Sequence, residues 1–341
     1  MATTGSAPSP ELFFDTMNAY QRTAALKTAI ELGLFTVMAE LSTAADVATR
    51  CGASERGTRI LCDYLTVLGF LTKTGERYQP TPDTALFLNR NSPAYLGGTM
   101  EFLASPGLVR NFDDLTATVR AGTVDQSRST VSPENPVWVS FARAMMPMMA
   151  PVADAIAEAM GVEAIHPLKV LDIAAGHGAF GLAMARRNAE AEIVAVDWAP
   201  VLEVALDNAR RFGVNARYRT IPGDAFTVDY GDGYQIAFVT NFLHHFDEPT
   251  CISLLTRVRR ALAPGGRVAI LEFVPNPDRI SPPASATFSL VMLGCTPHGD
   301  AYTFNEWRRI LESAGFSDAS QTPLAMSPET LVTAVSATQT K

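Results

Sequence analysis

The second half of the chain alternates between strand-like and helix-like segments, and this alternation limits the possible folds more than any other feature. Short apolar runs of strand length are separated by longer segments whose apolar residues recur at helical spacing. This order predicts an α/β fold with a mostly parallel sheet and helices on both faces. Seven strands are expected, at Lys169–Ile173, Glu192–Val196, Arg217–Thr220, Gln235–Thr240, Arg267–Glu272, Ser317–Thr322 and Glu329–Ala337. Helices are expected between them at Ala179–Asn188, Pro200–Phe212, Pro249–Leu262 and Thr303–Ala314.

The first of these strands leads into a turn of small residues, VLDIAAGHG from Val170 to Gly178. Small residues let the backbone turn sharply and let a ligand approach the peptide groups closely. The second strand ends before Asp197, whose carboxylate can accept hydrogen bonds from both hydroxyls of a ribose. Together with a further acid at Asp224, the pattern predicts a nucleoside site where the strands end.

The residues around this turn bear on which nucleoside binds. A phosphate-binding loop would need G-x-G-x-x-G or a lysine that follows the loop. Here alanines occupy two of the expected glycine positions, and Lys169 lies at the start of the strand and not after the loop. The turn therefore favours a ligand without phosphate. Gly181 completes a G-x-G-x-x-G spacing from Gly176, so an NAD-binding domain stays open as the alternative.

These motifs resemble those of the class I S-adenosylmethionine (SAM) methyltransferases over roughly the last two thirds of the chain. The matching parts are the strand and turn at Val170–Gly178, the second-strand acid Asp197 and the later Asp224. The resemblance implies a Rossmann-like methyltransferase domain of residues 166–341 that binds SAM without a metal. The residues it assigns to the cofactor are Asp172, Ala174, Gly176, Asp197, Trp198, Asp224, Ala225, Phe226 and Asn241.

Residues 1–98 predict a separate, mainly helical domain of the winged-helix type. Ser42 or Thr43 can cap a first short helix, and Ser54 can cap a longer second one. The segment Phe70–Tyr78 then predicts a small hairpin. DNA is one partner of such domains, but the first 100 residues hold 8 Lys/Arg and 9 Asp/Glu, and the whole chain has a net charge of −8. Because phosphates need an excess of positive charge, we expect the domain to mediate dimerisation and not nucleic-acid binding.

The segment between these domains, residues 99–165, is predicted to be a linker, and the sequence is expected to be helical from Asn91 to Ala159. It is rich in methionine and aromatic residues. The apolar face of this segment is predicted either to pack in the core between the domains or to form a wall of a substrate pocket, and the two interpretations are compatible. Thioethers and flat rings favour a planar apolar acceptor. The residues expected to line the substrate pocket are Phe141, Met145, Met149, His245, Phe288 and Met292.

Two histidines follow the fourth strand in the stretch TNFLHHFDEP. His244 is a good candidate for a general base, because an unperturbed imidazole titrates at about pH 6.5 and the strand delivers it to the ligand edge. Glu272 ends the neighbouring strand, where an acid can orient the imidazole and stabilise its charged form. His245 is predicted to cap the following segment.

The whole arrangement resembles the plant-type small-molecule O-methyltransferases and their bacterial relatives, which join a dimerisation domain, a linker helix and a SAM domain. The resemblance places the catalytic histidine at His244 and the orienting glutamate at Glu272. It implies a homodimer that methylates a hydroxyl of an aromatic or polyketide-like small molecule. Two positions depart from the plant pattern, because Ala301 stands in place of a second glutamate and Thr240 in place of a lysine. These departures leave the identity of the acceptor open.

Several alternatives stay open beside this interpretation. The same site could methylate nitrogen or carbon, or the fold could have lost methyl transfer. A SAM-sensing winged-helix regulator is the alternative from another class, and the acidic balance argues against it. His245, Asp247 and His298 mimic the iron triad of dioxygenases, but that triad belongs on a β-barrel, which the α/β pattern contradicts. The sequence lacks the carboxylate cluster of the magnesium-dependent catechol methyltransferases, so no metal is expected.

The remaining composition predicts an ordinary cytoplasmic protein. Charged residues make up 18% of the chain, and the mean hydropathy is +0.09. The four cysteines fit no metal or disulfide spacing, which suits a reducing cytoplasm. The first residues lack the apolar core of a secretion signal, and no apolar run has the length needed to span a bilayer, so no membrane partner is expected.

Overall fold

The computed structural model describes residues 7–38, 40–131, 135, 137–325 and 327–337. The chain divides into two compact units, Met1–Met100 and Glu101–Lys341. Each unit contains hydrophobic side chains that are fully buried, so each has a core of its own.

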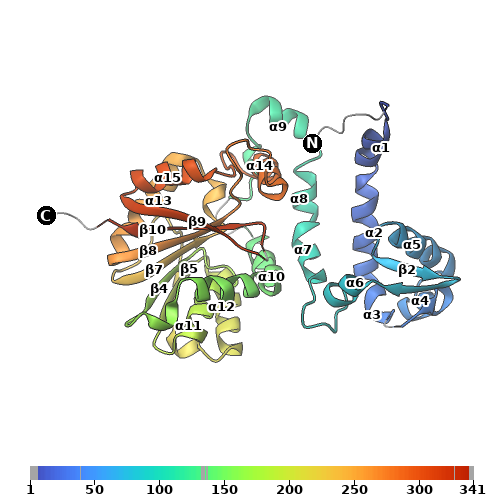
Figure 1. Cartoon of the computed structure of the whole chain (residues 1–341), viewed down its shortest axis with the longest axis horizontal. Helices are drawn as coiled ribbons and strands as arrows, with labels where there is room; N and C mark the ends of the chain where they lie inside the picture. Colours follow the sequence, from blue (N-terminus) through green and yellow to red (C-terminus); the bar gives the residue numbers. More distant parts are fainter. Residues whose placement is uncertain (1–6, 39, 132–134, 136, 326, 338–341) are drawn as a thin grey trace. The chain divides into compact units, whose positions relative to one another are not determined.

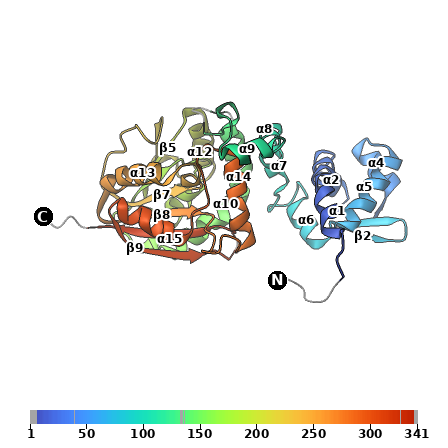
Figure 2. The same cartoon turned by 90° about the horizontal axis from the view of Figure 1, so that it is seen from above.

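Unit 1 has the helix–turn–helix and hairpin order of a winged helix, as the sequence predicts, with α4 packed against α5 and α5 beside β2 (Figure 2). Thr43 caps α4 in a reciprocal capping box with Asp46, and Ser54 caps α5 by accepting from the N–H of Gly57. The hairpin turns at Gly75, which has a φ of 57°. The helices are α1 (Glu11–Met17), α2 (Ala19–Glu31), α3 (Leu34–Val37), α4 (Ala44–Cys51), α5 (Glu55–Val67), α6 (Pro82–Phe87) and η1 (Gly97–Thr99). The strands β1 (Ser42–Thr43), β2 (Leu71–Thr74) and β3 (Arg77–Pro80) form a sheet in the order β1-β3-β2.

The segment predicted as helical from Asn91 to Ala159 consists of several short helices followed by one long one. Proline disfavours the helical conformation of the residue before it, and Ser105, which precedes Pro106, is extended and separates α7 from α8. Gly122 adopts a left-handed conformation and ends α9. Most of this segment belongs to unit 2, where α10 packs against α11 and α12. Its elements are α7 (Met100–Leu103), α8 (Pro106–Arg110), α9 (Leu115–Ala121), η2 (Gln126–Arg128), α10 (Val137–Ala159) and η3 (Val162–Ala164).

Unit 2 is built on a seven-stranded sheet in the order β6-β5-β4-β7-β8-β10-β9. The first five strands in this order are parallel, and β10 runs antiparallel to both β8 and β9. This confirms the predicted mostly parallel, Rossmann-like sheet. The strands are β4 (Lys169–Ile173), β5 (Glu192–Asp197), β6 (Tyr218–Pro222), β7 (Tyr234–Thr240), β8 (Leu262–Glu272), β9 (Phe316–Pro323) and β10 (Thr330–Ser336).

Helices cover both faces of this sheet, with α11 and α12 on one face and α13 and α15 on the other (Figure 1). The helix α14 was not expected from the sequence. The helices of this part are α11 (Ala179–Arg187), α12 (Ala199–Arg211), η4 (Asn215–Arg217), η5 (Leu243–His245), α13 (Glu248–Ala261), α14 (Pro283–Cys295) and α15 (Phe304–Ser313). Since β5 and β7 lie on opposite sides of β4, the chain order reverses there, which opens a ligand crevice at the carboxyl ends of these strands.

The fifth strand starts earlier than the sequence predicts. Its pairing with β7 jumps from Leu262 to Arg267, and Gly265 has a φ of 75°. Pro264, Gly265 and Gly266 therefore form a bulge inside β8.

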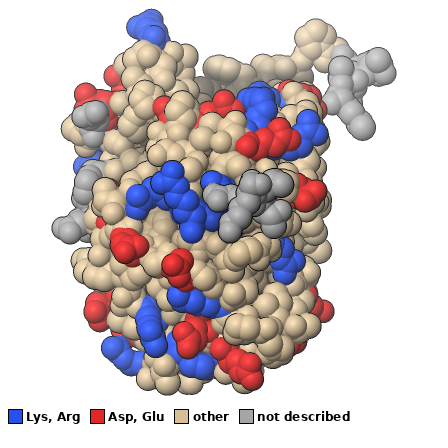
Figure 3. Space-filling view, turned by 90° about the vertical axis from the view of Figure 1, so that its left-hand side faces the viewer, with Lys and Arg blue, Asp and Glu red and all other residues tan. Residues whose placement is uncertain are grey.

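The charged surface of unit 2 is mixed. Figure 3 shows basic and acidic side chains interspersed on one face of the molecule. Some form ion pairs, as Arg187 does with Glu158 and Glu163. Among the helices of the described residues, none combines the length and the apolar character that crossing a membrane would require.

Candidate active site

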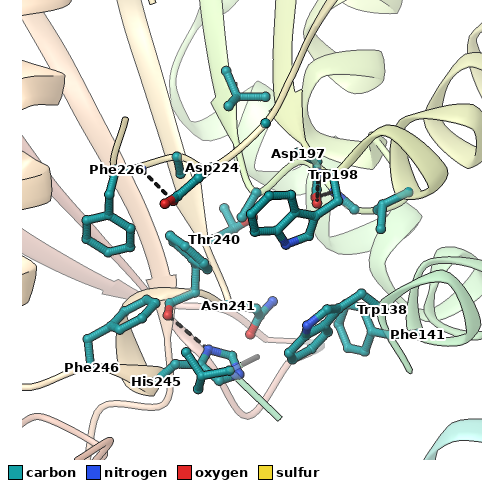
Figure 4. A pocket seen from close by; sticks show the side chains of 18 residues that line it. Trp138, Phe141, Asp197, Trp198, Asp224, Phe226, Thr240, Asn241, His245 and Phe246 are labelled. Carbon is teal, nitrogen blue, oxygen red and sulfur yellow. Dashed lines mark hydrogen bonds between the residues drawn. The ribbon is translucent and has the colours of Figure 1, made fainter. Parts of the chain in front are cut away.

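A cavity of about 260 Å³ lies where β4, β5 and β7 end, at the predicted crevice (Figure 4). Its wall combines two carboxylates with aromatic, aliphatic and small residues. The lining residues are Val131, Trp138, Phe141, Ala174, Gly176, Val196, Asp197, Trp198, Val201, Gly223, Asp224, Ala225, Phe226, Thr240, Asn241, Phe242, His245 and Phe246.

Asp197 is held in place by the backbone around it. Its Oδ2 accepts from the N–H of Gly176 at 2.8 Å, and its Oδ1 accepts from the N–H of Trp198 at 2.7 Å. Burial raises the pKa of Asp197 to about 6, although these two hydrogen bonds oppose the shift. Each carboxylate oxygen keeps a second acceptor position, so the side chain can still bind two hydroxyl groups of a ligand.

The turn between β4 and α11 depends on residues without a large side chain. Ala174 and Gly176 have φ values of 53° and 56°. A Cβ atom on Gly178 would lie 2.6 Å from the Tyr218 hydroxyl, so only glycine fits there. His177, which the sequence leaves without a role, accepts from the N–H of Ala179 through Nδ1 at 3.1 Å and thereby supports the start of α11.

Asp224 shapes the opposite wall of the cavity. Its Oδ1 accepts from the N–H of Phe226 at 2.9 Å, which fixes a tight turn. The Phe226 ring then contacts Phe246 edge to face, with 5.0 Å between the ring centres, and lies 6.2 Å from Phe242. This aromatic group provides a flat apolar surface next to a carboxylate, a combination that suits a planar base carrying hydrogen-bond donors.

A buried acid–histidine pair joins the loop that follows β7 to the end of β8. Glu272 Oε1 accepts from the backbone N–H groups of Phe242, Leu243 and His244 at 3.1, 2.9 and 3.3 Å. Its Oε2 lies 2.5 Å from Nδ1 of His244. These contacts confirm that the ends of β7 and β8 bring the two predicted residues together.

The environment of this pair sets its protonation. Burial lowers the pKa of His244 well below its ordinary value, because the charged imidazolium loses its water. Burial also raises the pKa of Glu272, while three backbone N–H donors oppose that shift. With the imidazole neutral, its Nδ1–H can donate to Oε2 of Glu272, and Nε2 of His244 is then the acceptor nitrogen.

His245 lines the cavity but does not cap the following helix, so that prediction is wrong. Its Nδ1–H donates to the Phe242 carbonyl at 2.9 Å, and its ring meets Trp138 edge to face at 5.3 Å. The cap of α13 is Asp247, which accepts from the N–H of Thr250 at 2.9 Å. An acid in that position satisfies a free backbone donor directly.

The loop between α14 and α15 packs against the backbone of His244 and His245. The N–H of Asp300 donates to the His244 carbonyl at 3.0 Å. A Cβ atom on Gly299 would collide with that same carbonyl oxygen and would lie 2.5 Å from Thr296 Oγ1. Ala301, where the plant pattern has its second glutamate, is buried and brings no acid to this loop.

The structure places most of the predicted cofactor residues at the cavity, with Asp172 as the exception. The carboxyl of Asp172 is fully buried and accepts from the N–H of Gly181 at 3.1 Å, so it supports the first turn of α11 from behind. The residues that line the cavity as predicted are Ala174, Gly176, Asp197, Trp198, Asp224, Ala225, Phe226 and Asn241.

The predicted substrate residues divide between the cavity wall and its surroundings. Phe141 and His245 line the cavity. Phe288 meets the His244 ring edge to face at 4.9 Å. The methionines lie deeper: Met145 and Met149 belong to the core and Met292 is buried in α14.

Eight lining residues were not predicted from the sequence as site residues. These are Val131, Trp138, Val196, Val201, Gly223, Thr240, Phe242 and Phe246. The last two flank the histidine pair at i−2 and i+2 of His244, and aromatic residues beside a candidate base would have been a usable signal. Within the described residues, no group of three or more His, Cys, Asp or Glu side chains could hold a metal ion.

These features define a Rossmann-like enzyme domain with a nucleoside-sized cavity beside a buried histidine–carboxylate pair. The family model of an O-methyltransferase domain matches residues 129–317, which is more than half of the chain, and the model of an O-methyltransferase dimerisation domain matches residues 14–90. The chain therefore belongs to the O-methyltransferase family. The predicted enzyme class is confirmed, and SAM, the expected cofactor, is the methyl donor that this family uses.

Individual relatives agree with this assignment. The crystal structure of a putative O-methyltransferase from Nostoc punctiforme is 51% identical and covers 97% of this chain and 100% of its own, with a TM-score of 0.93. The 3-hydroxy-5-methyl-1-naphthoate 3-O-methyltransferase of Streptomyces sahachiroi is 27% identical over 91% of this chain and 90% of its own. Human N-acetylserotonin methyltransferase in complex with SAM shares the fold, with a TM-score of 0.84 at 22% identity over 98% of this chain and 100% of its own.

Proposed function

We propose that this O-methyltransferase transfers the methyl group of SAM to a hydroxyl of an aromatic or polyketide-like small molecule. In this proposal His244 is the general base and Glu272 is its positioning partner. The observation that carries the proposal is the buried His244–Glu272 pair beside a cavity whose charged residues are all acidic. The naphthoate methyltransferase named above is the kind of relative that motivates the acceptor class.

The residues of the cavity fit the proposed cofactor. Among the residues that the structure describes, its lining contains two carboxylates, Asp197 and Asp224, and neither lysine nor arginine. The carboxylates can accept hydrogen bonds from the ribose hydroxyls and the adenine amino group of SAM, and they complement its positive charge. A dinucleotide would instead need cations or backbone amides to bind its phosphates. When bound, SAM supplies an electrophilic methyl group on a sulfonium centre.

The two residues of the pair have distinct tasks in this proposal. His244 removes the proton of the acceptor hydroxyl through Nε2 and so makes the oxygen nucleophilic. Glu272 holds Nδ1 and stabilises the imidazolium that forms. Because Glu272 is itself fixed by three backbone N–H groups, the imidazole is held in one orientation.

The acceptor side is aromatic. Phe288 stands edge to face on His244 and stacks on Phe273, with 3.9 Å between these two ring centres. Phe141 and Trp138 form an edge-to-face pair at 6.0 Å on the cavity wall. Rings arranged in this way favour a flat apolar acceptor, which agrees with a phenol or naphthol.

The proposal is tested by substituting the two histidines separately. In His244→Ala we expect methyl transfer from labelled SAM to a panel of phenols and naphthols to fall by about 10²–10⁴. The affinity for S-adenosylhomocysteine (SAH) should hardly change, because the base faces the acceptor. Glu272→Gln should lie between this variant and the wild type.

His245→Ala is the matched control, since it removes a neighbouring imidazole that contacts Trp138 and not Glu272. It should slow transfer far less than His244→Ala. If His245→Ala were the more damaging change, the roles of the two histidines would be reversed. If neither variant slowed transfer, base catalysis by this pair would be wrong.

A further inference from the structure

A buried acid that the proposed mechanism does not use lies at the start of the last strand. Glu329 is 5% exposed and directly precedes β10. Because β10 runs antiparallel to β8, its first residue, Thr330, pairs with Glu272. The reversal of the last strand thus brings Glu329 to the edge where the parallel strands end, which is the edge that carries the active site.

The carboxyl group of Glu329 is held by a neighbouring hydroxyl group. The hydroxyl of Ser327 donates to Oε2 at 2.8 Å, and the N–H of Glu329 donates to Ser327 Oγ at 3.2 Å. The side-chain amide of Asn241 lies close enough to the same carboxyl to lower its pKa. Burial and the nearby Glu272 raise the pKa of Glu329 to about 7, and both side-chain donors oppose that rise. A carboxyl this deeply buried needs such donors, since burying it without them is unfavourable.

Asn241 connects this acid to the cavity. Its N–H donates to the Leu271 carbonyl at 2.9 Å, and its φ of 51° lies in the left-handed region, which asparagine tolerates. Its Nδ2 lies 3.9 Å from Sδ of Met149, which is a weak acceptor. Figure 4 shows the Asn241 side chain in the middle of the cavity, between His245 and Trp198. A short amide in that place needs a strong partner to keep one orientation.

We propose that Glu329 is a positioning residue that holds the side-chain amide of Asn241 in one orientation in the wall of the cofactor cavity. The amide N–H of Asn241 donates to the Glu329 carboxyl, and Ser327 holds that carboxyl from the other side. The amide oxygen of Asn241 is thereby left available to the ligand. The inference depends on the proposed function only in taking SAM and SAH as the ligands of this cavity.

A double-mutant cycle on the full-length chain tests the inference through SAH affinity, measured by calorimetry. Glu329→Leu and Asn241→Ala should each weaken SAH binding by about tenfold, the effect of losing a hydrogen bond to a charged group. The double variant should bind no more weakly than Asn241→Ala alone, because Glu329 acts through Asn241. Glu329→Gln keeps an acceptor oxygen and should restore most of the affinity.

The control is Glu312→Gln on α15, where an acid with a 63% exposed side chain forms a surface ion pair with Arg308 at 3.9 Å. It should leave SAH affinity unchanged. Losses that simply add in the double variant would overturn the inference, since Glu329 and Asn241 would then act independently. If Glu329→Leu does not fold, Glu329→Met, which fills a similar length, takes its place in the cycle.

Crystal structures of the variants provide a readout that does not depend on the cofactor. The Asn241 side chain should leave its position in Glu329→Leu and keep it in Glu329→Gln. An unchanged Asn241 in the leucine variant would contradict the inference. A wild-type protein that binds no SAH would contradict the proposed function instead, and the crystal structures would still decide the role of Glu329.

Discussion

Burial and hydrogen bonding act in opposite directions on Asp197. Withdrawal from water favours the neutral acid, whereas the N–H groups of Gly176 and Trp198 favour the carboxylate. Burial prevails, so the pKa of Asp197 rises to about 6. Only the ionised form offers acceptor positions on both oxygens, since a protonated carboxyl uses one oxygen as a donor. The proposed contact between Asp197 and the cofactor is therefore expected to be sensitive to mildly acidic conditions.

The affinity for SAH should therefore fall as the pH decreases through about 6. Above that pH Asp197 is ionised and accepts from the ligand, and below it the proton competes with the ligand. Calorimetry at pH 8 and pH 5 should show a loss of about tenfold, the effect of removing a hydrogen bond to a charged acceptor. Asp197→Asn should bind more weakly at pH 8 and lose this pH dependence. The same pH dependence in Asp197→Asn would assign the titration to another group.

Among the elements of unit 2, helix α13 and the loop between α14 and α15 hold the segment that contains His244 and His245. On one side Asp247 caps α13 directly after η5. On the other side the loop between α14 and α15 bonds to the His244 carbonyl through Asp300. Gly299 lets these two backbones approach, because any side chain there would collide with the carbonyl oxygen. The position of His244 therefore depends on packing as much as on its own strand.

Gly299→Ala should displace the loop that carries His244. We expect methyl transfer to fall by about 10²-fold, since a displacement of about 1 Å at a reacting group has an effect of this size. Stability should decrease by about 1–3 kcal/mol, as for other overpacked sites. Gly107→Ala on α8, where a Cβ atom meets no other atom within 4 Å, is the control and should leave both unchanged. Chemical denaturation and methyl-transfer rates measure the two effects. Wild-type rates in Gly299→Ala would show that the loop tolerates the contact.

In the whole molecule, unit 1 is notable for large apolar side chains that are exposed to solvent. Leu12 is 79% exposed and Val67 82% exposed, and Phe13, Phe14 and Met17 are also exposed on α1. Exposed apolar groups of this extent mark an interaction surface. The matched dimerisation domain, residues 14–90, contains most of this unit. The expected partner is a second copy of the chain.

Light scattering on the intact protein at micromolar concentration should give the mass of a dimer. The double substitution Phe13→Asp and Phe14→Asp should shift it towards the monomer, because each buried phenylalanine contributes about 1.5–3 kcal/mol. Ile280→Asp, which makes the same kind of change at a 76% exposed position in unit 2, should leave the mass unaltered. A wild-type monomer under these conditions would rule out the homodimer.

Local sequence patterns were sufficient to predict the Rossmann-like sheet, the winged-helix order of unit 1 and the turn after β4. These features depend on local patterns: alternation of apolar runs, capping residues such as Thr43 and Ser54, and small residues at Val170–Gly178. The pairing of His244 with Glu272 could also be predicted from the sequence, because neighbouring parallel strands end at one edge of a sheet.

The packing of the folded chain decided other contacts, which the order of strands and helices does not predict. It turned Asp172 away from the cavity and directed His245 into the cavity wall. It also brought Glu329 next to the active site, because the last strand enters the sheet in the reverse direction. Sequence periodicity reports which face of an element is apolar but not which distant element covers it, so these contacts follow from packing alone.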